Sequence, residues 1–150
     1  MARSTTILLA EDDANDATLV GIALRRNVAG IPLFVVNDGV EVISYLKGEG
    51  PYADRRRFPF PDLLLLDLKM PRMDGFEVLR WLRQQPILKR MPVIVLTNSA
   101  RQADAELAYE AGANSYLVKP TSSEDFAKTM EVVSDFWLGG PMIPDSMPSA

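Results

Sequence analysis

Five short apolar segments recur along the chain, at residues 6–10, 33–36, 63–67, 93–97 and 115–118. The third begins with four leucines in a row, without the alternation of apolar and polar positions that marks a strand with one face in water. Such a run predicts a strand covered on both faces. Asn37-Asp38-Gly39, directly after the second segment, is a turn signal. We therefore predict five short strands separated by turns and longer connections.

The stretches between these strands carry apolar residues at helical spacing. Phe76, Leu79 and Leu82, for example, recur at i, i+3 and i+6. The predicted helices cover residues 15–26, 40–47, 75–84 and 102–111, and a last segment whose inner face holds Phe126, Met130, Val133 and Trp137. Gly112 is expected to end the fourth helix, and a capping box at residues 121–124 is expected to start the last one.

Strands and helices alternate, and each helix is long enough for a right-handed crossover between parallel strands. This predicts one α/β domain over residues 1–138, a doubly wound three-layer sandwich around a parallel five-stranded sheet. Residues 139–150, with prolines at 141, 144 and 148, are predicted to form a C-terminal extension. In such open sheets the functional site lies outside the carboxyl ends of the strands.

Polar residues with matching chemistry follow four of the predicted strands, namely Asp12, Asp13, Asp67, Thr97 and Lys119. A carboxylate at this edge can accept a phosphoryl group directly as a mixed anhydride. A hard divalent cation with oxygen ligands lowers the repulsion between that anionic nucleophile and an anionic donor. Asp13 and Asp67 are candidate Mg²⁺ ligands, with Asp12 placed to help. Lys119 and Thr97 can contact phosphoryl oxygens.

Each of these residues also has an ordinary structural interpretation. Asp12 and Asp13 precede a predicted helix, where acids commonly cap the first turn. Asp67 could be a turn acid, Thr97 the end of a strand, and Lys119 a surface lysine. All five interpretations would have to hold together at one edge of one sheet, so the joint functional interpretation is favoured.

Composition narrows the classes of function further. The chain lacks cysteine and histidine, which excludes disulfides, thiolate zinc sites and Ser-His or Cys-His catalysis. A net charge of −4 argues against nucleic-acid binding through a strongly basic surface. No apolar run approaches the ~20 residues of a membrane helix, and the start of the chain lacks a signal-peptide pattern. A cytoplasmic protein without nucleic-acid or membrane partners is expected.

The motifs Glu11-Asp12-Asp13, Asp67 to Gly75, Thr97 and Lys119-Pro120 resemble those of bacterial receiver domains, the chemotaxis-regulator type, over about residues 5–138. The resemblance implies a flavodoxin-like (βα)5 fold with strand order 2-1-3-4-5. It implies a phosphoryl acceptor that serves a sensor histidine kinase and catalyses only its own phosphorylation and hydrolysis.

The resemblance also implies a role for each site residue. Asp67 would be the phosphorylated aspartate and Lys119 the phosphate-binding lysine. The implied metal ligands are Asp12, Asp13, Asp67 and the backbone carbonyl of Lys69, with Mg²⁺ as the ion. Thr97 and Tyr116 would be the switch pair, which rearranges the helix at 102–111 on phosphorylation. The Lys119–Pro120 bond is expected to be cis.

A narrower resemblance concerns the stand-alone regulators paired with bacterial phytochrome kinases. It is carried by Tyr45-Leu46, the loop at 48–61, the segment 112–120 and the ending Phe136-Trp137-Leu138. It implies a bacteriophytochrome as kinase partner. Since only a dozen residues follow Leu138, output is expected through protein contact or onward phosphotransfer, without a DNA-binding domain.

Two segments leave alternatives open. The tail around Met142 and Ile143 is either a frayed terminus or an arm, joined by Trp137 and Leu138, that packs on a second copy. A homodimer is favoured. The run at 55–57, three arginines, is interpreted as a solvated loop, with a contact to the kinase as the alternative.

Two rival functions share parts of this pattern. A degenerate receiver that binds partners constitutively would be expected to lack an acid, the threonine or the lysine, and none is missing. A phosphatase of the haloacid dehalogenase type also uses an aspartyl phosphate. That family carries a second aspartate two residues after the nucleophile, where this chain has Lys69.

Overall fold

The computed structural model describes residues 5–137, with side chains to residue 135. The strands are β1 (Ile7–Ala10), β2 (Leu33–Val36), β3 (Leu63–Leu66), β4 (Val93–Thr97) and β5 (Ser115–Val118). The helices are α1 (Ala14–Asn27), α2 (Gly39–Lys47), α3 (Gly75–Gln84), α4 (Gln102–Ala111) and α5 (Ser123–Trp137), with a short 3₁₀ turn at Gly50–Tyr52. The predictions for the Trp137 side chain and for residues 138–150 lie outside this description.

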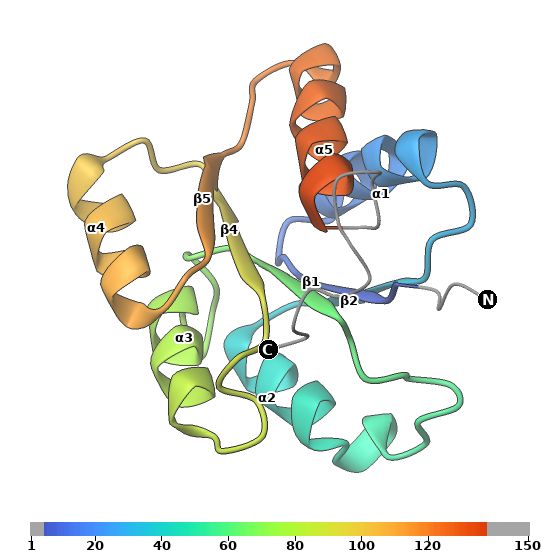
Figure 1. Cartoon of the computed structure of the whole chain (residues 1–150), viewed down its shortest axis with the longest axis vertical. Coiled ribbons are helices and arrows are strands. Elements are labelled where there is room, and N and C mark those ends of the chain that lie inside the picture. The colour runs from blue at the N-terminus through green and yellow to red at the C-terminus, as the bar shows by residue number, and fades with distance from the viewer. Residues whose placement is uncertain (1–4, 138–150) are drawn as a thin grey trace.

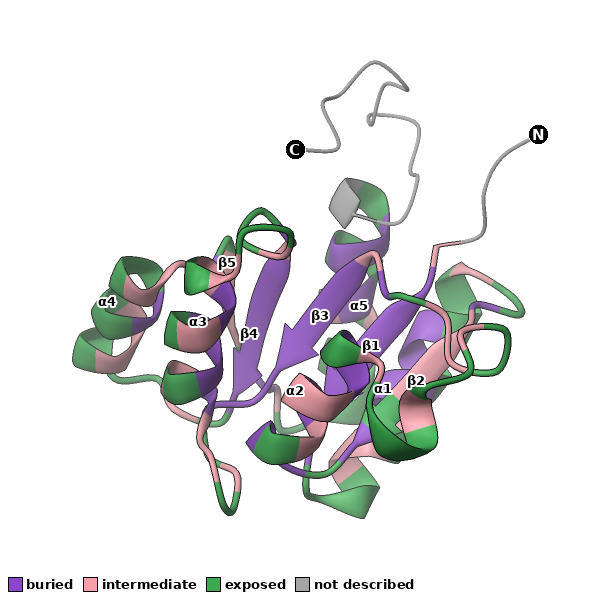
Figure 2. Ribbon diagram, turned by 90° about the horizontal axis from the view of Figure 1, so that it is seen from below, coloured by how far each residue is buried: buried purple, intermediate pink, exposed green. Residues whose placement is uncertain are grey.

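All five strands are parallel and lie in the order β2-β1-β3-β4-β5, which confirms the predicted fold. Along β3 the leucines alternate between two cores: Leu63 and Leu65 pack with α1 and α5, and Leu64 and Leu66 pack with α2, α3 and α4. Figure 1 shows α1 and α5 side by side on one face of the sheet. The central strands are buried, whereas β2 and β5 at the edges are partly exposed (Figure 2).

Side-chain caps mark where α2, α3 and α5 begin. The Asp38 carboxylate accepts from the Glu41 amide at the start of α2, and Asp74 and Glu77 form a capping box at the start of α3. At α5 the prediction was wrong by one residue. The Ser122 hydroxyl caps the helix by accepting from the Asp125 amide at 3.1 Å, so the capping residue is Ser122 and not Thr121.

The loop at 48–61 is more ordered than a solvated arginine run suggests. The Arg55 guanidinium donates to the backbone carbonyls of Tyr45 (2.8 Å) and Leu46 (2.9 Å), the last turn of α2. The prediction of a solvated run is therefore wrong for Arg55 and confirmed for Arg56 and Arg57, which are exposed. Arg55 thus adds side-chain donors to the carbonyls of the last turn of α2, where the helix's own amides run out.

Two further sequence-based expectations meet the structure here. The described residues contain no cis peptide bond, so the expectation of a cis Lys119–Pro120 bond was wrong. The trans preference of such bonds is small, about 0.5–1 kcal/mol, and either isomer is accessible. Within residues 5–137, no helix is long and apolar enough to cross a membrane.

Candidate functional site

The register of the parallel strands brings the polar residues together. Ala10 on β1 pairs with Leu66 on β3, so the residues that follow them, Glu11 and Asp67, leave the sheet side by side. The Asp67 amide donates to the Ala10 carbonyl at 3.1 Å, which extends that pairing by one residue. Lys119 follows β5, and its amide donates to the Thr97 carbonyl at 2.7 Å. Four chain segments thus converge at the carboxyl edge of the sheet.

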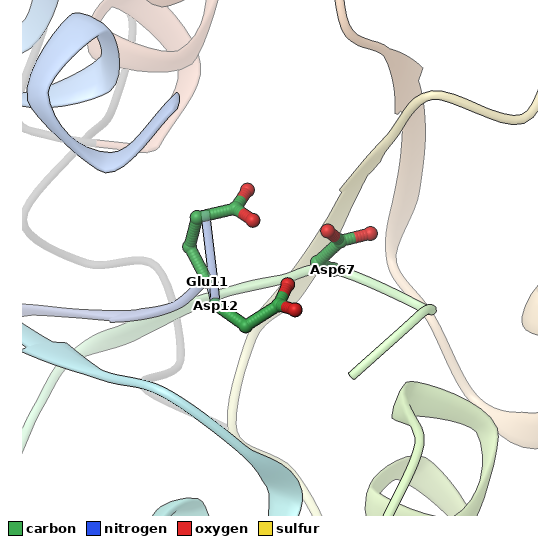
Figure 3. A group of neighbouring side chains, drawn as sticks. All are labelled: Glu11, Asp12 and Asp67. Atoms are coloured by element: carbon green, nitrogen blue, oxygen red, sulfur yellow. The ribbon is translucent and has the colours of Figure 1, made fainter. Parts of the chain in front are cut away.

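Three carboxylates form a cluster at this edge, from Glu11, Asp12 and Asp67. Their oxygens lie within 4.8 Å of one another, and Figure 3 shows the side chains gathered beside the end of β3. Glu11 and Asp67 are only 2% and 6% exposed, whereas Asp12 faces solvent. A set of oxygen donors that is open on one side fits a hard divalent cation that keeps some of its waters.

Asp13, the other acid predicted as a metal ligand, does not join the cluster. Its carboxylate caps α1 by accepting from the amides of Asn15 (2.8 Å) and Asp16 (3.1 Å). Glu11 takes the place in the cluster that sequence reasoning gave to Asp13. The register offers the missing signal, because the residue directly after β1 lies beside the residue directly after β3.

Lys119 is buried and contacts three carboxylates at once. Its ammonium pairs with Glu11 at short range, with Asp16 at 2.9 Å and with Asp67 at 3.1 Å. Burial by itself would lower the pKa of Lys119, but these contacts outweigh it and raise the pKa above its ordinary value. Lys119 therefore stays charged beside Asp67. Sequence reasoning did not single out Asp16, which contributes from the first turn of α1.

Glu11 is a second titratable group whose pKa this environment raises. Burial raises the pKa of Glu11 to about 7, and the nearby charge of Asp67 adds to the rise, whereas the hydrogen bond from Lys119 opposes it. The ordinary value is 4.5. The site therefore holds more acid than its one lysine neutralises, and a divalent cation would relieve that excess.

The turn after β3 forms one wall of a cleft beside the acids. Gly75 makes this turn feasible, because a Cβ atom there would lie 2.4 Å from the Asp67 carbonyl oxygen. The cleft has a volume of about 660 Å³, and its lining includes Asp12, Lys69 and Ser99. Lys69 is exposed at the rim, and its amide points to the Asp67 carboxylate at 3.4 Å. Asp12 belongs both to the lining of this cleft and to the acid cluster, so the cleft lies next to Asp67.

The predicted switch residues lie on the next two strands. Thr97 is buried at the end of β4, with its hydroxyl 3.5 Å from the Ser99 amide. Tyr116 on β5 is half-buried, and its hydroxyl donates to the Ser99 carbonyl at 2.8 Å. The Ser99 hydroxyl in turn donates to Asp104 in the first turn of α4 at 2.5 Å. The loop between β4 and α4 is thus tied to both Tyr116 and α4.

Comparison with known proteins agrees with this arrangement. A family model for the response regulator receiver domain matches residues 7–131. Response regulator Rcp1 of Synechocystis sp. (strain ATCC 27184 / PCC 6803 / Kazusa) is 38% identical over 138 residues, 92% of each chain. Its Mn²⁺-bound crystal structure superposes with a TM-score of 0.81 and 37% identity, over 93% of this chain and 99% of that one.

Two further solved structures are similar over most of their length. The phosphorylated cyanobacterial phytochrome response regulator RcpA has a TM-score of 0.85 and 34% identity, covering 95% of this chain and 99% of that one. The bacteriophytochrome response regulator RtBRR has a TM-score of 0.74 and 35% identity, covering 98% and 86%. These relatives are phytochrome-associated response regulators, as the narrower resemblance implied. With the family match over most of the chain, the protein belongs to the response regulator receiver domain family.

Proposed function

We propose that this protein accepts a phosphoryl group on Asp67 from a sensor histidine kinase, with Mg²⁺ as cofactor, and signals by a change of conformation. One observation carries the proposal. The buried Asp67 carboxylate touches the Lys119 ammonium at 3.1 Å and lies within 4.8 Å of the other two acids of the cluster. A candidate nucleophile, a buried cation and a cluster of oxygen donors that can hold a metal ion thus share one edge.

The transfer follows from the chemistry of these groups. An oxygen of Asp67 bonds to phosphorus while the phosphorus–nitrogen bond to the kinase histidine breaks, and the electron pair leaves on the imidazole nitrogen. Lys119 stays beside the acceptor and neutralises phosphoryl charge. Glu11, Asp12, Asp67 and the carbonyl of Lys69 would hold Mg²⁺, which supplies further charge neutralisation. Hydrolysis by water returns the carboxylate and releases phosphate.

The signal would travel through the loop that follows β4. Phosphorylation adds close to two negative charges and new acceptor oxygens at Asp67. The Thr97 hydroxyl would turn toward these oxygens, and Tyr116 would then move inward. That movement disturbs the bond from Tyr116 to the Ser99 carbonyl and, through Ser99, the start of α4. A local charge change thereby biases a two-state element.

The partners belong to the proposal as well. The names of RcpA and RtBRR link those relatives to phytochromes, which supports a bacteriophytochrome as the kinase of this chain. The output partner would be a protein or a further phosphotransfer component. A homodimer is also proposed, and the exposed apolar side chains of Leu107, Tyr109 and Val118 on α4 and β5 offer it a surface.

Intact-protein mass spectrometry tests the acceptor. The wild type is incubated with acetyl phosphate and Mg²⁺, beside Asp67→Asn and beside wild type with a chelator. One phosphoryl adduct is expected on the wild type with Mg²⁺. None is expected on Asp67→Asn or on the wild type with the chelator. Absence of an adduct on the wild type, with both acetyl phosphate and a phosphorylated kinase as donors, would overturn the proposal in favour of a constitutive binding module.

A further inference from the structure

Lys119 has three ammonium protons to donate, and three carboxylates surround it. Two of them, Glu11 and Asp67, belong to the acid cluster. The third, Asp16, comes from α1 and lies outside that cluster, with its carboxylate oxygen 2.9 Å from the ammonium nitrogen. The Asp16 side chain is 22% exposed, whereas that of Lys119 is 2% exposed. Asp16 therefore reaches into the site from its rim.

The partners within the cluster must change during the proposed reaction. Metal binding draws on the oxygens of Glu11, and phosphorylation turns one oxygen of Asp67 into an anhydride oxygen. Asp16 takes part in neither event. We infer that Asp16 is the positioning residue that holds the Lys119 ammonium at the acceptor before and during transfer. The inference rests on the function proposed above.

The contact geometry indicates that Asp16 holds the Lys119 ammonium near Asp67 and does not compete with Asp67 for it. Lys119 touches Asp67 and Asp16 at the same time, at 3.1 and 2.9 Å, so Asp16 does not pull the ammonium away from the acceptor. A lysine side chain is flexible and loses much freedom when it is fixed. A partner that fixes it in advance removes that loss from the transfer step. Without Asp16 the ammonium would be held less firmly once metal binding draws on the oxygens of Glu11.

The alternative, which must be distinguished from a positioning role, is that Asp16 has a purely structural role. An acid in the first turn of a helix interacts favourably with the helix dipole, so Asp16→Ala could weaken α1 and nothing else. Such a role would act whether or not Lys119 is present. A positioning role would disappear once Lys119 is removed, and a double-mutant cycle distinguishes the two.

The experiment measures the rate of phosphorylation by acetyl phosphate at saturating Mg²⁺. Asp16→Ala is expected to slow the reaction about tenfold, whereas Asp16→Asn, which keeps an acceptor oxygen for the ammonium, should recover most of the rate. In a Lys119→Met background Asp16→Ala should have no further effect. Glu131→Ala, which removes an exposed acid from α5, serves as the control for charge and is expected to match the wild type.

A second readout needs no phosphoryl donor. NMR relaxation of the Lys119 Cε group at saturating Mg²⁺, when metal binding draws on the oxygens of Glu11, should report a rigid side chain in the wild type and a more mobile one in Asp16→Ala. An unchanged rate and an unchanged Lys119 mobility in Asp16→Ala would overturn the inference, as would an equal loss of rate in the Lys119→Met background. Failure of the proposed function is a separate result, because the wild type itself would then take up no phosphoryl group.

Discussion

Lys119 is a buried cation and Arg83 a partly buried one at a different place in the fold, and their partners differ in kind. Lys119 pairs with the carboxylates of Glu11, Asp16 and Asp67. Arg83 on α3 donates to the neutral carbonyl of Gly112 at 2.6 Å and to that of Met91 at 2.8 Å.

This difference separates a reactive centre from a structural one. Carbonyl partners fix Arg83 between α3, the loop before β4 and the turn after α4, and they leave its charge unopposed. Burial accordingly lowers the pKa of Arg83, whereas the carboxylates around Lys119 raise the pKa of that lysine. The acids around Lys119 exceed it in number, and this excess of charge is what a metal ion and a phosphoryl group can rearrange.

The largest expected effect is that of Lys119→Met on phosphorylation. Loss of a cation that stabilises transferred charge slows such reactions by roughly 100-fold or more. The rate of acetyl phosphate labelling, followed by mass, checks this. Lys128→Met removes an exposed lysine from α5 and should react like the wild type. A Lys119→Met rate within a factor of three of the wild type would contradict the role given to Lys119.

Arg83→Met should show the opposite behaviour. It leaves the carbonyls of Gly112 and Met91 without their donor and should lower the free energy of unfolding by about 2 kcal/mol. Its rate of labelling per folded molecule should stay unchanged. Urea unfolding measures the first quantity, with the exposed Arg80→Met on the same helix as control. Equal stabilities of the two variants would show that the carbonyl contacts contribute little.

A smaller effect is expected from pH, through Glu11. The pKa of Glu11 is raised in the folded protein, from 4.5 to about 7. The contribution of Glu11 to the free energy of unfolding is therefore fully present below pH 4.5 and is lost as the pH rises through 7. Between pH 6 and 8 the metal-free protein should lose about 1 kcal/mol of unfolding free energy.

The composition of the chain makes this measurement clean. The chain has no histidine, so few other groups titrate in this range. In Glu11→Gln the loss between pH 6 and 8 should largely vanish, and thermal melts at both pH values measure it. If the variant kept the full wild-type slope, Glu11 would not be its source.

The smallest expected effect concerns the switch. Tyr116→Phe removes the hydroxyl that donates to the Ser99 carbonyl, a bond of about 1 kcal/mol. Amide hydrogen exchange in the loop after β4 should become faster, with little change in α1. If hydrogen exchange throughout that loop matched the wild type, the Tyr116 hydroxyl would not stabilise the loop in the unphosphorylated state.

The sequence predicted the elements well because their signals are local. Residues 63–67 were expected to form a strand and 63–66 do so, since an uninterrupted leucine run has few alternatives. Gly112 ends α4 with φ of +114°, as a glycine after a helix is expected to do. Helix boundaries were right to within a residue for the same reason.

The parts of the site that sequence reasoning missed depend on contacts between distant segments. Glu11, and not Asp13, lies beside Asp67 because of the register of β1 against β3, which composition does not encode. Asp16 meets Lys119 only once the start of α1 and the residue after β5 come together at the edge of the sheet. Arg55 leaves solvent only because the end of α2 lies within its reach.

The central claim is that Asp67 itself carries the phosphoryl group, and locating the modified residue tests it most directly. Borohydride reduces an aspartyl phosphate to homoserine, which peptide mass spectrometry then finds in the labelled protein. Homoserine at position 67 is the predicted result. Homoserine at position 12 or 13, or a stable phosphate ester on Thr97, would contradict the account.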